Sequence, residues 1–245
     1  MEMQTVDHLL AAVLDGEAQR AAEFLRADPG LLRARNMFGV SAVHAAHFTG
    51  RADLATRLLP SDPPDLFLAA ELGRLDVIDD LLGRQPGLAL EFDDRGSTAL
   101  HGSCYWGQAQ AARRLLRAGA DPSAPTRDQF LQIAPLGSAI ATTPGVPQPS
   151  DDEDAVLALV RLLLEHGADP HQARRDGMTP LHSAAWRGLG RVAQELIDAG
   201  ASPSAVATAG PHEGQTPADT ALSQGYIVLA ARLDTGAEQV ASPYG

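Results

Sequence analysis

A short phrase recurs along this chain, and this repetition constrains the fold more than any other feature of the sequence. The clearest copy, DGMTPLHSAAWRGLGRVAQELIDAG, spans residues 176–200, and a second, RGSTALHGSCYWGQAQAARRLLRAGAD, spans residues 95–121. Fainter copies begin at Gly39 and Gly214. A phrase that returns about every 33 residues is typical of a solenoid, in which each repeat is one supersecondary unit stacked on the next. We therefore expect an all-α stack of helix pairs, in which a catalytic pocket is not predicted.

Within each clear copy, the residue types match the parts of such a helix pair. Thr179 can cap the first helix, and Pro180 suits its first turn, where the missing N–H costs nothing. Leu181 is expected to point into the stack. The apolar face of the second helix is supplied by Val192, Leu196 and Ile197.

One glycine per unit is expected to end the first helix, in the left-handed conformation that glycine adopts most easily. These glycines divide the chain into about seven units, of which the outer two are atypical. They are Gly16, Gly50, Gly73, Gly107, Gly188 and Gly225, with Thr143 in the fifth unit. The predicted units cover residues 5–36, 37–64, 65–92, 93–126, 127–173, 174–207 and 208–235 of a single domain, 1–245, with a tail at 236–245.

Several of these phrases are those of a known repeat family. TPLH at 179–182, TALH at 98–101 and the GAD turns at 119–121 and 167–169 resemble the ankyrin repeat. The resemblance extends over nearly the whole chain, and we interpret it as a bacterial-type ankyrin repeat protein. It implies antiparallel helix pairs joined by projecting hairpin loops, with a concave groove, and it implies binding to other proteins rather than catalysis.

Two units depart from the pattern. The interval between Gly50 and Gly73 is short, and PSDPPDLFLAAELG starts the third unit's first helix almost at once, which leaves no room for a hairpin. In the fifth unit, residues 134–137 read APLG in place of TPLH, and about a dozen inserted residues, within ATTPGVPQPSDDEDA, form a predicted surface loop.

This insert ends in four consecutive carboxylates, Asp151, Asp152, Glu153 and Asp154. One interpretation is a solvated turn that starts the next helix, because Asp and Glu are favoured at helix N-termini. The other is an added contact for a basic partner. The spaced acids and central glycine of a calcium-binding loop are absent, so no metal site is predicted.

The resemblance also implies that the two residues before each helix-ending glycine face the groove. In this chain both tryptophans occupy such positions. Because Trp, Tyr and Arg often anchor interfaces, we predict that this stripe and the hairpin tips bind a partner. The alternative is that the rings fill gaps between neighbouring units. The predicted partner-binding residues are Met37, Phe38, Phe48, Leu72, Arg95, Tyr105, Trp106, Trp186 and Arg187.

No chemistry-bearing cluster is evident. His44, His101 and His182 end the TPLH-type phrases, where the resemblance implies a hydrogen bond that ties hairpin to helix. The single cysteine, Cys104, is interpreted as a small core residue. All 19 basic residues are arginine, which excludes Schiff-base catalysis and the P-loop lysine. We therefore predict no catalytic residue, no cofactor, no metal and no enzymatic activity.

Charge and composition narrow the partners. The net charge of −12 disfavours nucleic acid and anionic membranes, because both are bound by clustered cations. With one cysteine, no apolar run of about 20 residues and no secretory signal, a cytoplasmic protein is expected, with a monomer favoured. The leading hypothesis is a protein–protein interaction scaffold, with a basic partner as a narrower version. The alternative is a regulator, inhibitor or accessory protein of a specific enzyme, and end-to-end assembly also stays open.

Overall fold

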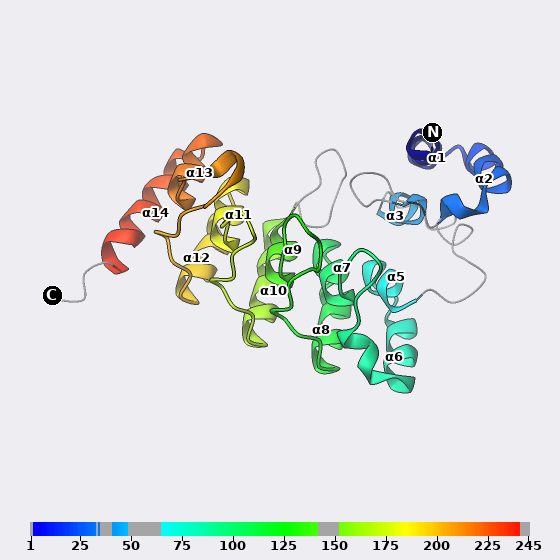
Figure 1. Cartoon of the computed structure of the whole chain (residues 1–245), viewed down its shortest axis with the longest axis horizontal. Helices are drawn as coiled ribbons and strands as arrows, with labels where there is room; N and C mark the ends of the chain where they lie inside the picture. Colours follow the sequence, from blue (N-terminus) through cyan, green and yellow to red (C-terminus); the bar gives the residue numbers. More distant parts are fainter. Residues whose placement is uncertain (1, 33, 35–40, 49–64, 142–151, 241–245) are drawn as a thin grey trace. The chain divides into compact units, whose positions relative to one another are not determined.

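The computed structural model describes residues 2–32, 34, 41–48, 65–141 and 152–240, and its regular elements are drawn in Figure 1. Apart from one isolated bridge between Phe92 and Thr98, every regular element in these ranges is an α-helix or a short 3-10 helix, which confirms the all-α fold. The residues divide into two compact units, the first within 1–65 and the second from Leu66 onwards. The division into seven repeats of one domain stays a prediction.

The first unit is a small helical cluster. It contains α1 (Glu2–Asp15), α2 (Ala18–Ala27), a 3-10 turn η1 (Pro29–Leu32) and α3 (Ala42–Phe48). Helix α1 packs against both α2 and α3. Its apolar residues recur three and four positions apart, so that Val6, Leu9, Leu10 and Val13 share one face and are buried.

The second unit is a stack of helix pairs in two layers (Figure 1). One layer is formed by α5 (Leu66–Glu71), α7 (Ala99–Tyr105), α9 (Pro135–Ile140), α11 (Pro180–Arg187) and α13 (Pro217–Ser223). The other layer contains α6 (Leu75–Arg84), α8 (Ala109–Arg117), α10 (Glu153–Glu165), α12 (Gly190–Asp198) and α14 (Ile227–Val240). Short 3-10 turns, η2 (Pro86–Leu90) and η4 (Gly210–His212), lie in the connections. Each of α5 to α13 in the first layer contacts the next one, as a solenoid requires.

Sequence phasing located the helix ends correctly. Gly107 and Gly188 both have φ of +71°, a left-handed conformation that strains other residues, and Gly16, Gly73 and Gly225 are left-handed too. Gly50 and Thr143 lie outside the described residues. Helix α5 begins at Leu66, directly after the proline-rich stretch, as the short interval predicts.

The TPLH phrase acts as a capping box. Thr179 caps α11 by accepting the backbone N–H of His182, and the backbone N–H of Thr179 donates to His182 Nδ1 at 3.1 Å. Because Nδ1 accepts, Nε2 carries the proton and donates to the Gln215 carbonyl in the next hairpin at 3.1 Å. Thr98 and His101 repeat this arrangement at α7, with Ile133 as the acceptor at 3.0 Å. The implied structural role of these histidines is confirmed. The His44 side chain lies outside the described residues.

The core of the stack consists of small and aliphatic side chains at the predicted positions. Leu181, Ala184, Ala185, Val192 and Leu196 are fully buried, while Ile197 is partly buried. Cys104 is buried too, and burial raises the pKa of its thiol to about 12, so it is a core residue, as expected.

Candidate partner-binding surface

The hairpins between helix pairs are joined into a continuous row by backbone hydrogen bonds. The Arg127 N–H donates to the Gly96 carbonyl at 2.8 Å, and the Arg175 N–H donates to the Leu131 carbonyl at 2.9 Å. The Thr208 N–H donates to the Asp176 carbonyl at 2.8 Å. Each hairpin is therefore held by the one before it, and the row forms a fixed platform for the side chains at its tips.

The hairpin at residues 126–133 is also locked from within. The Thr126 N–H donates to the Ile133 carbonyl at 2.9 Å, which closes its base. At its tip, the Asp128 carboxylate accepts the backbone N–H groups of Phe130 at 2.7 Å and Leu131 at 2.6 Å. The same carboxylate also accepts the Gln132 N–H and the Thr126 hydroxyl.

This carboxylate stays ionised, and the turn that it holds is strained. Burial alone would raise the pKa of Asp128, but the hydrogen bonds from Thr126 and from the three backbone N–H groups lower it below its usual value. Gln132 has φ of +51°, which is uncommon for a residue other than glycine. Such a conformation costs about 1–3 kcal/mol and persists only where the surroundings enforce it.

The locked hairpin presents apolar side chains to solvent. Phe130 is 83% exposed, and Leu131 beside it is exposed as well. Sequence reasoning missed both residues, although Leu131 precedes Ala134 by three residues, just as Arg95 at its hairpin tip precedes Thr98. An aromatic ring on a rigid loop is preorganised for binding, because little conformational freedom remains to be lost.

Two arginines brace this hairpin. The Arg175 guanidinium donates from Nη1 to the Gln129 carbonyl at 2.7 Å, from the following hairpin. The Arg127 guanidinium lies 3.7 Å from the centre of the Phe92 ring, in cation–π geometry. Arg127 and Phe92 also line an open hollow of about 620 Å³, whose other lining residues include Leu90 and Gln132.

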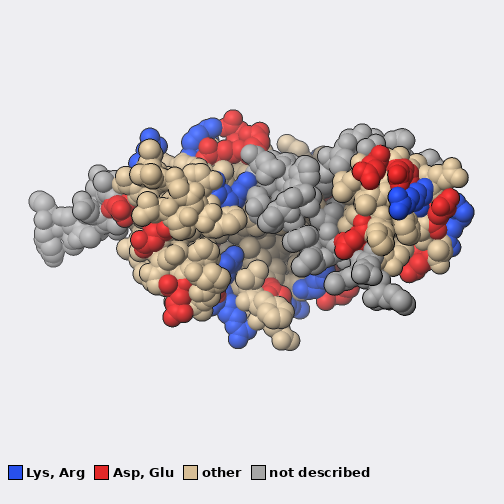
Figure 2. Space-filling view, turned by 90° about the horizontal axis from the view of Figure 1, so that it is seen from above, with Lys and Arg blue, Asp and Glu red and all other residues tan. Residues whose placement is uncertain are grey.

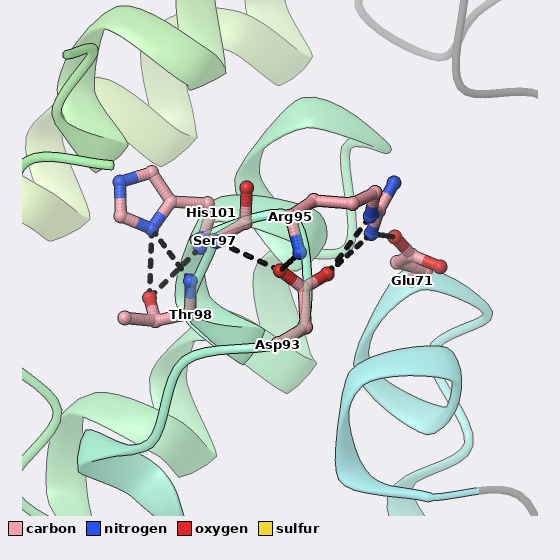
Figure 3. A network of polar contacts seen from close by, with 6 residues as sticks. All are labelled: Glu71, Asp93, Arg95, Ser97, Thr98 and His101. Atoms are coloured by element: carbon pink, nitrogen blue, oxygen red, sulfur yellow. Dashed lines mark hydrogen bonds and ion pairs between the residues drawn. The ribbon is translucent and has the colours of Figure 1, made fainter. Parts of the chain in front are cut away.

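Arg95, a predicted partner-binding residue, is part of a polar network (Figure 3). Its guanidinium contacts Asp93 at 2.7 Å and the buried carboxylate of Glu71, at the end of α5, at 3.2 Å. Burial works against the charged form of Arg95, but these two carboxylates keep its pKa above the usual value. Asp93 also accepts the Ser97 N–H at 2.8 Å, so the network fixes this hairpin against α5 and α7.

Two predicted groove residues are not on the surface. Leu72 is 5% exposed and Trp106 is 2% exposed, so the expectation that they face solvent is wrong. Helix α7, whose C-cap is Trp106, is flanked by α5 and α9 in its layer. Trp106 is also in edge contact with Tyr105, at 5.3 Å between ring centres. Both residues are buried, and for Trp106 this favours the alternative that the ring fills a gap rather than meets a partner.

The next aromatic of the predicted stripe lies differently. Trp186 is exposed, as predicted, near the C-terminus of α11. Its neighbour Arg187 is partly buried and donates to the Ile140 carbonyl at 2.8 Å, which satisfies an acceptor at the end of α9. Tyr105 is also partly buried. Among Leu72, Tyr105, Trp106, Trp186 and Arg187, the predicted groove contacts with a described side chain, Trp186 is the exposed one.

The remaining predicted contacts belong to the first unit. Met37 and Phe38 lie outside the described residues, and Phe48 ends α3 with a side chain that is not described. Their role in partner binding stays a prediction.

The acidic insert has a structural role at its end. Asp152 caps α10 by accepting the Asp154 N–H at 3.0 Å. The Glu153 carboxylate accepts the Arg191 N–H at 2.8 Å, in the first turn of α12, and Asp154 forms an ion pair with the Arg191 side chain. The predicted helix-starting turn is confirmed, and it also caps the following unit. Asp151 lies outside the described residues.

Acidic and basic side chains are mixed on the face drawn in Figure 2. Among the described residues of this face, Asp and Glu lie interspersed with Arg. Among the described residues, no group of three or more His, Cys, Asp or Glu side chains is arranged to hold a metal ion. No helix in this part of the chain has the length and apolarity that crossing a membrane requires.

Comparisons with known proteins identify the repeat. A family model described as "Ankyrin repeat" matches residues 95–127, which include α7 and α8. A second, described as "Ankyrin repeats (many copies)", matches residues 153–197, from α10 into α12. Both matches fall on units whose helices, hairpins and caps follow the repeated phrase.

Curated relatives carry the same repeat. The chain is 36% identical over 151 residues to ankyrin repeat and SOCS box protein 16 of Mus musculus, which covers 58% of this chain and 31% of that protein. It is 33% identical over 132 residues to neurogenic locus notch homolog protein 1 of Xenopus tropicalis, a match that covers 54% of this chain and 5% of that protein. It is 57% identical over 44 residues to putative ankyrin repeat protein YahD of Escherichia coli (strain K12), a match that covers 18% of this chain and 22% of that protein. The chain thus spans less than a third of each of these relatives, and its stacked helix pairs, capping boxes and matched segments together make it an ankyrin repeat protein.

Proposed function

We propose that this chain is a scaffold that binds a protein partner, with the hairpin tip at Phe130 and Leu131 as the main anchor and Trp186 as a second contact. Ankyrin repeats generally act as protein–protein interaction modules, which supports the general class. The observation that carries the specific proposal is the 83% exposure of Phe130 on a hairpin locked by Asp128.

The energetic argument rests on exposure and rigidity together. Covering an exposed Phe or Leu side chain contributes about 1.5–3 kcal/mol, which corresponds to roughly a 10- to 100-fold change in affinity. A mobile loop would lose part of this gain on ordering, whereas the hairpin held by Asp128 and Arg175 is already ordered. A strained Gln132 beside the tip is consistent with a loop shaped for contact rather than for stability alone.

The proposal is tested first by affinity purification from the native cell. The wild type is compared with the Phe130→Ser/Leu131→Ser variant and with Trp186→Ala. Val206→Ser is the matched control, because Val206 is also an exposed apolar residue but lies outside this hairpin. Circular dichroism and thermal unfolding confirm that all four proteins are folded.

The partner recovered with wild type is then purified and titrated against each variant. We expect the hairpin variant to weaken binding at least 10-fold, Trp186→Ala to weaken it less, and Val206→Ser to leave it unchanged. Equal affinity of the hairpin variant and wild type would exclude this anchor. If the partner is an enzyme, its kcat/KM with and without the chain separates regulation from scaffolding.

A further inference from the structure

Arg175 lies along the hairpin tip that carries Phe130. Its backbone N–H donates to the Leu131 carbonyl at 2.9 Å, and its side-chain Nη1 donates to the Gln129 carbonyl at 2.7 Å. These two carbonyls belong to the residues on either side of Phe130, so the guanidinium is held against the tip itself. Because Phe130 is 83% exposed, a single partner segment can contact both the ring and the guanidinium.

The charge of Arg175 is not matched by a carboxylate of the described residues. At the preceding tip, Arg95 contacts two carboxylates, and Arg174, the neighbour of Arg175, contacts Asp176 at 2.5 Å. Within the described ranges Arg175 forms no ion pair, and its side chain donates to the Gln129 carbonyl. A guanidinium has five N–H donors in a planar fork, so further donors remain for a second acceptor.

Two carboxylates close to Arg175 in the row of hairpins are already engaged. Asp128, in the hairpin that Arg175 braces, accepts one hydroxyl and three backbone N–H groups. Asp176 accepts two N–H groups of the Arg174 side chain and the Met178 N–H at 3.1 Å. A shift of either carboxylate towards Arg175 would break these bonds, so solvent or a partner must match its charge.

The opposite side of this hairpin, next to the preceding repeat, has a different charge. Arg127 stacks on Phe92 there and also forms no ion pair with a residue that the structure describes. Three exposed carboxylates come from the connections around it: Glu91, Asp94 and Asp121. Negative charge exceeds positive charge on this side, so an acidic segment is repelled there and attracted on the Arg175 side.

We propose that a partner segment packs an apolar side chain against Phe130 and Leu131 and pairs an adjacent Asp or Glu with Arg175. The proposal rests on the partner-binding function proposed above and adds the chemistry of the partner. Because the bond to the Gln129 carbonyl holds the guanidinium in place, its free N–H groups can donate to a carboxylate with little loss of conformational freedom.

This chemistry differs from the basic partner that the net charge of −12 suggests. Charges on a solvated surface are screened over about 8 Å at physiological ionic strength, so a contact depends on the groups beside it rather than on the sum over the chain. The exposed neighbours of the ring, Gln129 and Gln132, are uncharged. At this tip the unmatched group is therefore the cation of Arg175.

The test uses random linear peptides that are displayed on phage and selected on the purified wild-type chain. Asp and Glu should be enriched beside apolar residues relative to the unselected library. Each selected peptide is then synthesised twice, with its acidic residue and with the matching amide, Asn or Gln. In a fluorescence titration, the acidic peptide should bind roughly 3- to 10-fold more tightly than the amide peptide.

Variants of the chain assign this difference to one residue. In Arg175→Gln the acidic and amide peptides should bind equally, whereas Arg175→Lys should keep part of the difference because it keeps the charge. Arg117→Gln is the matched control, since Arg117 on α8 is exposed and also forms no ion pair within the described ranges. A loosened hairpin in Arg175→Gln would weaken both peptides alike, so the difference between the peptides isolates the charge pairing.

Peptides enriched in Lys or Arg instead would indicate that the carboxylates around Arg127 direct binding, and the proposal would fall. It would fall equally if no peptide is enriched, or if Arg175→Gln leaves the difference between the acidic and amide peptides intact. The native partner separates these outcomes from the function proposed above. Phe130→Ser/Leu131→Ser still weakens that partner if the pairing with Arg175 alone is wrong, and leaves its affinity unchanged if the anchor itself is wrong.

Discussion

Because His101 resists protonation in the folded protein, the helix stack from Leu66 onwards should become less stable as the pH falls below 6.5. Its Nδ1 accepts the Thr98 N–H at 3.1 Å, and its Nε2 donates to the Ile133 carbonyl at 3.0 Å. Protonation would place a hydrogen on Nδ1, directly against the Thr98 N–H. Mainly because the ring is buried, the pKa of His101 falls from 6.5 to about 4.

The direction of the effect follows from which state binds the proton. In the unfolded chain His101 titrates near 6.5, whereas in the folded protein it titrates near 4. The stabilising contribution is therefore complete above pH 6.5 and is lost progressively down to pH 4. The difference between the two pKa values corresponds to a loss of about 2 kcal/mol by pH 5 and about 3 kcal/mol by pH 4.

Trp106 provides a local probe for this measurement. It is buried at the end of α7, and His101 lies in the first turn of the same helix, so the fluorescence of Trp106 reports unfolding of that region. Urea unfolding is followed at several pH values between 7 and 4 in a Trp186→Phe background, with and without His101→Gln. The pKa of His182 is also lowered by burial, but its contribution is common to both proteins and cancels in the difference.

We expect the protein with His101 to lose about 3 kcal/mol more than the His101→Gln protein between pH 7 and pH 4. The glutamine variant should be less stable at pH 7, because it lacks one or both of these hydrogen bonds. Parallel losses in the two proteins would refute the argument. So would an NMR titration in which His101 of the folded protein ionises near its ordinary pKa of 6.5.

Three further predictions concern single residues of the second unit. Trp106→Ala should lower the free energy of unfolding by about 3–5 kcal/mol, whereas Trp186→Ala should lower it by less than about 1 kcal/mol; similar urea midpoints for the two variants would contradict the burial difference. Ala134→Thr should stabilise by about 1 kcal/mol, because Ala134 has the same φ of −86° and ψ of 163° as the capping residue Thr98; a lower thermal midpoint would argue against this cap. Cys104, with a thiol pKa of about 12, should resist an aromatic disulfide reagent at pH 8 until urea unfolds the protein; rapid labelling of the native protein would exclude its burial.

Local backbone chemistry accounts for what could be predicted of the fold. A threonine followed by proline and, three residues later, by histidine is a capping box whose partners are close in sequence, so Thr179 and His182 could be placed without a structure. A helix-ending glycine such as Gly188 is equally local, since its left-handed conformation depends on one residue. Such signals extend over a few residues, and this is why helix positions were predicted well.

The candidate site depends on contacts between neighbouring repeats. Aligning the repeats on their helix-ending glycines does not define these contacts. Trp106 lies one residue before its glycine and Trp186 lies two, so the two rings point about 100° apart around the helix, and only Trp186 is exposed. Leu72, which also lies one residue before its glycine, is buried like Trp106, so treating both positions as one stripe was the error. Phe130 was missed because its hairpin precedes APLG at residues 134–137, which lacks the threonine and histidine that mark the other hairpin ends.

The acidic turn and the hairpin tip differ in what a partner would have to displace. A basic partner at Asp154 would compete with Arg191, and any shift of Glu153 would remove the carboxylate that accepts the Arg191 N–H at the start of α12. Binding there would therefore weaken a contact that joins two units. Covering Phe130 breaks no hydrogen bond of the hairpin, because Asp128 holds the backbone and leaves the ring exposed. Since binding retains only the surplus over such costs, the hairpin tip is the more favourable anchor.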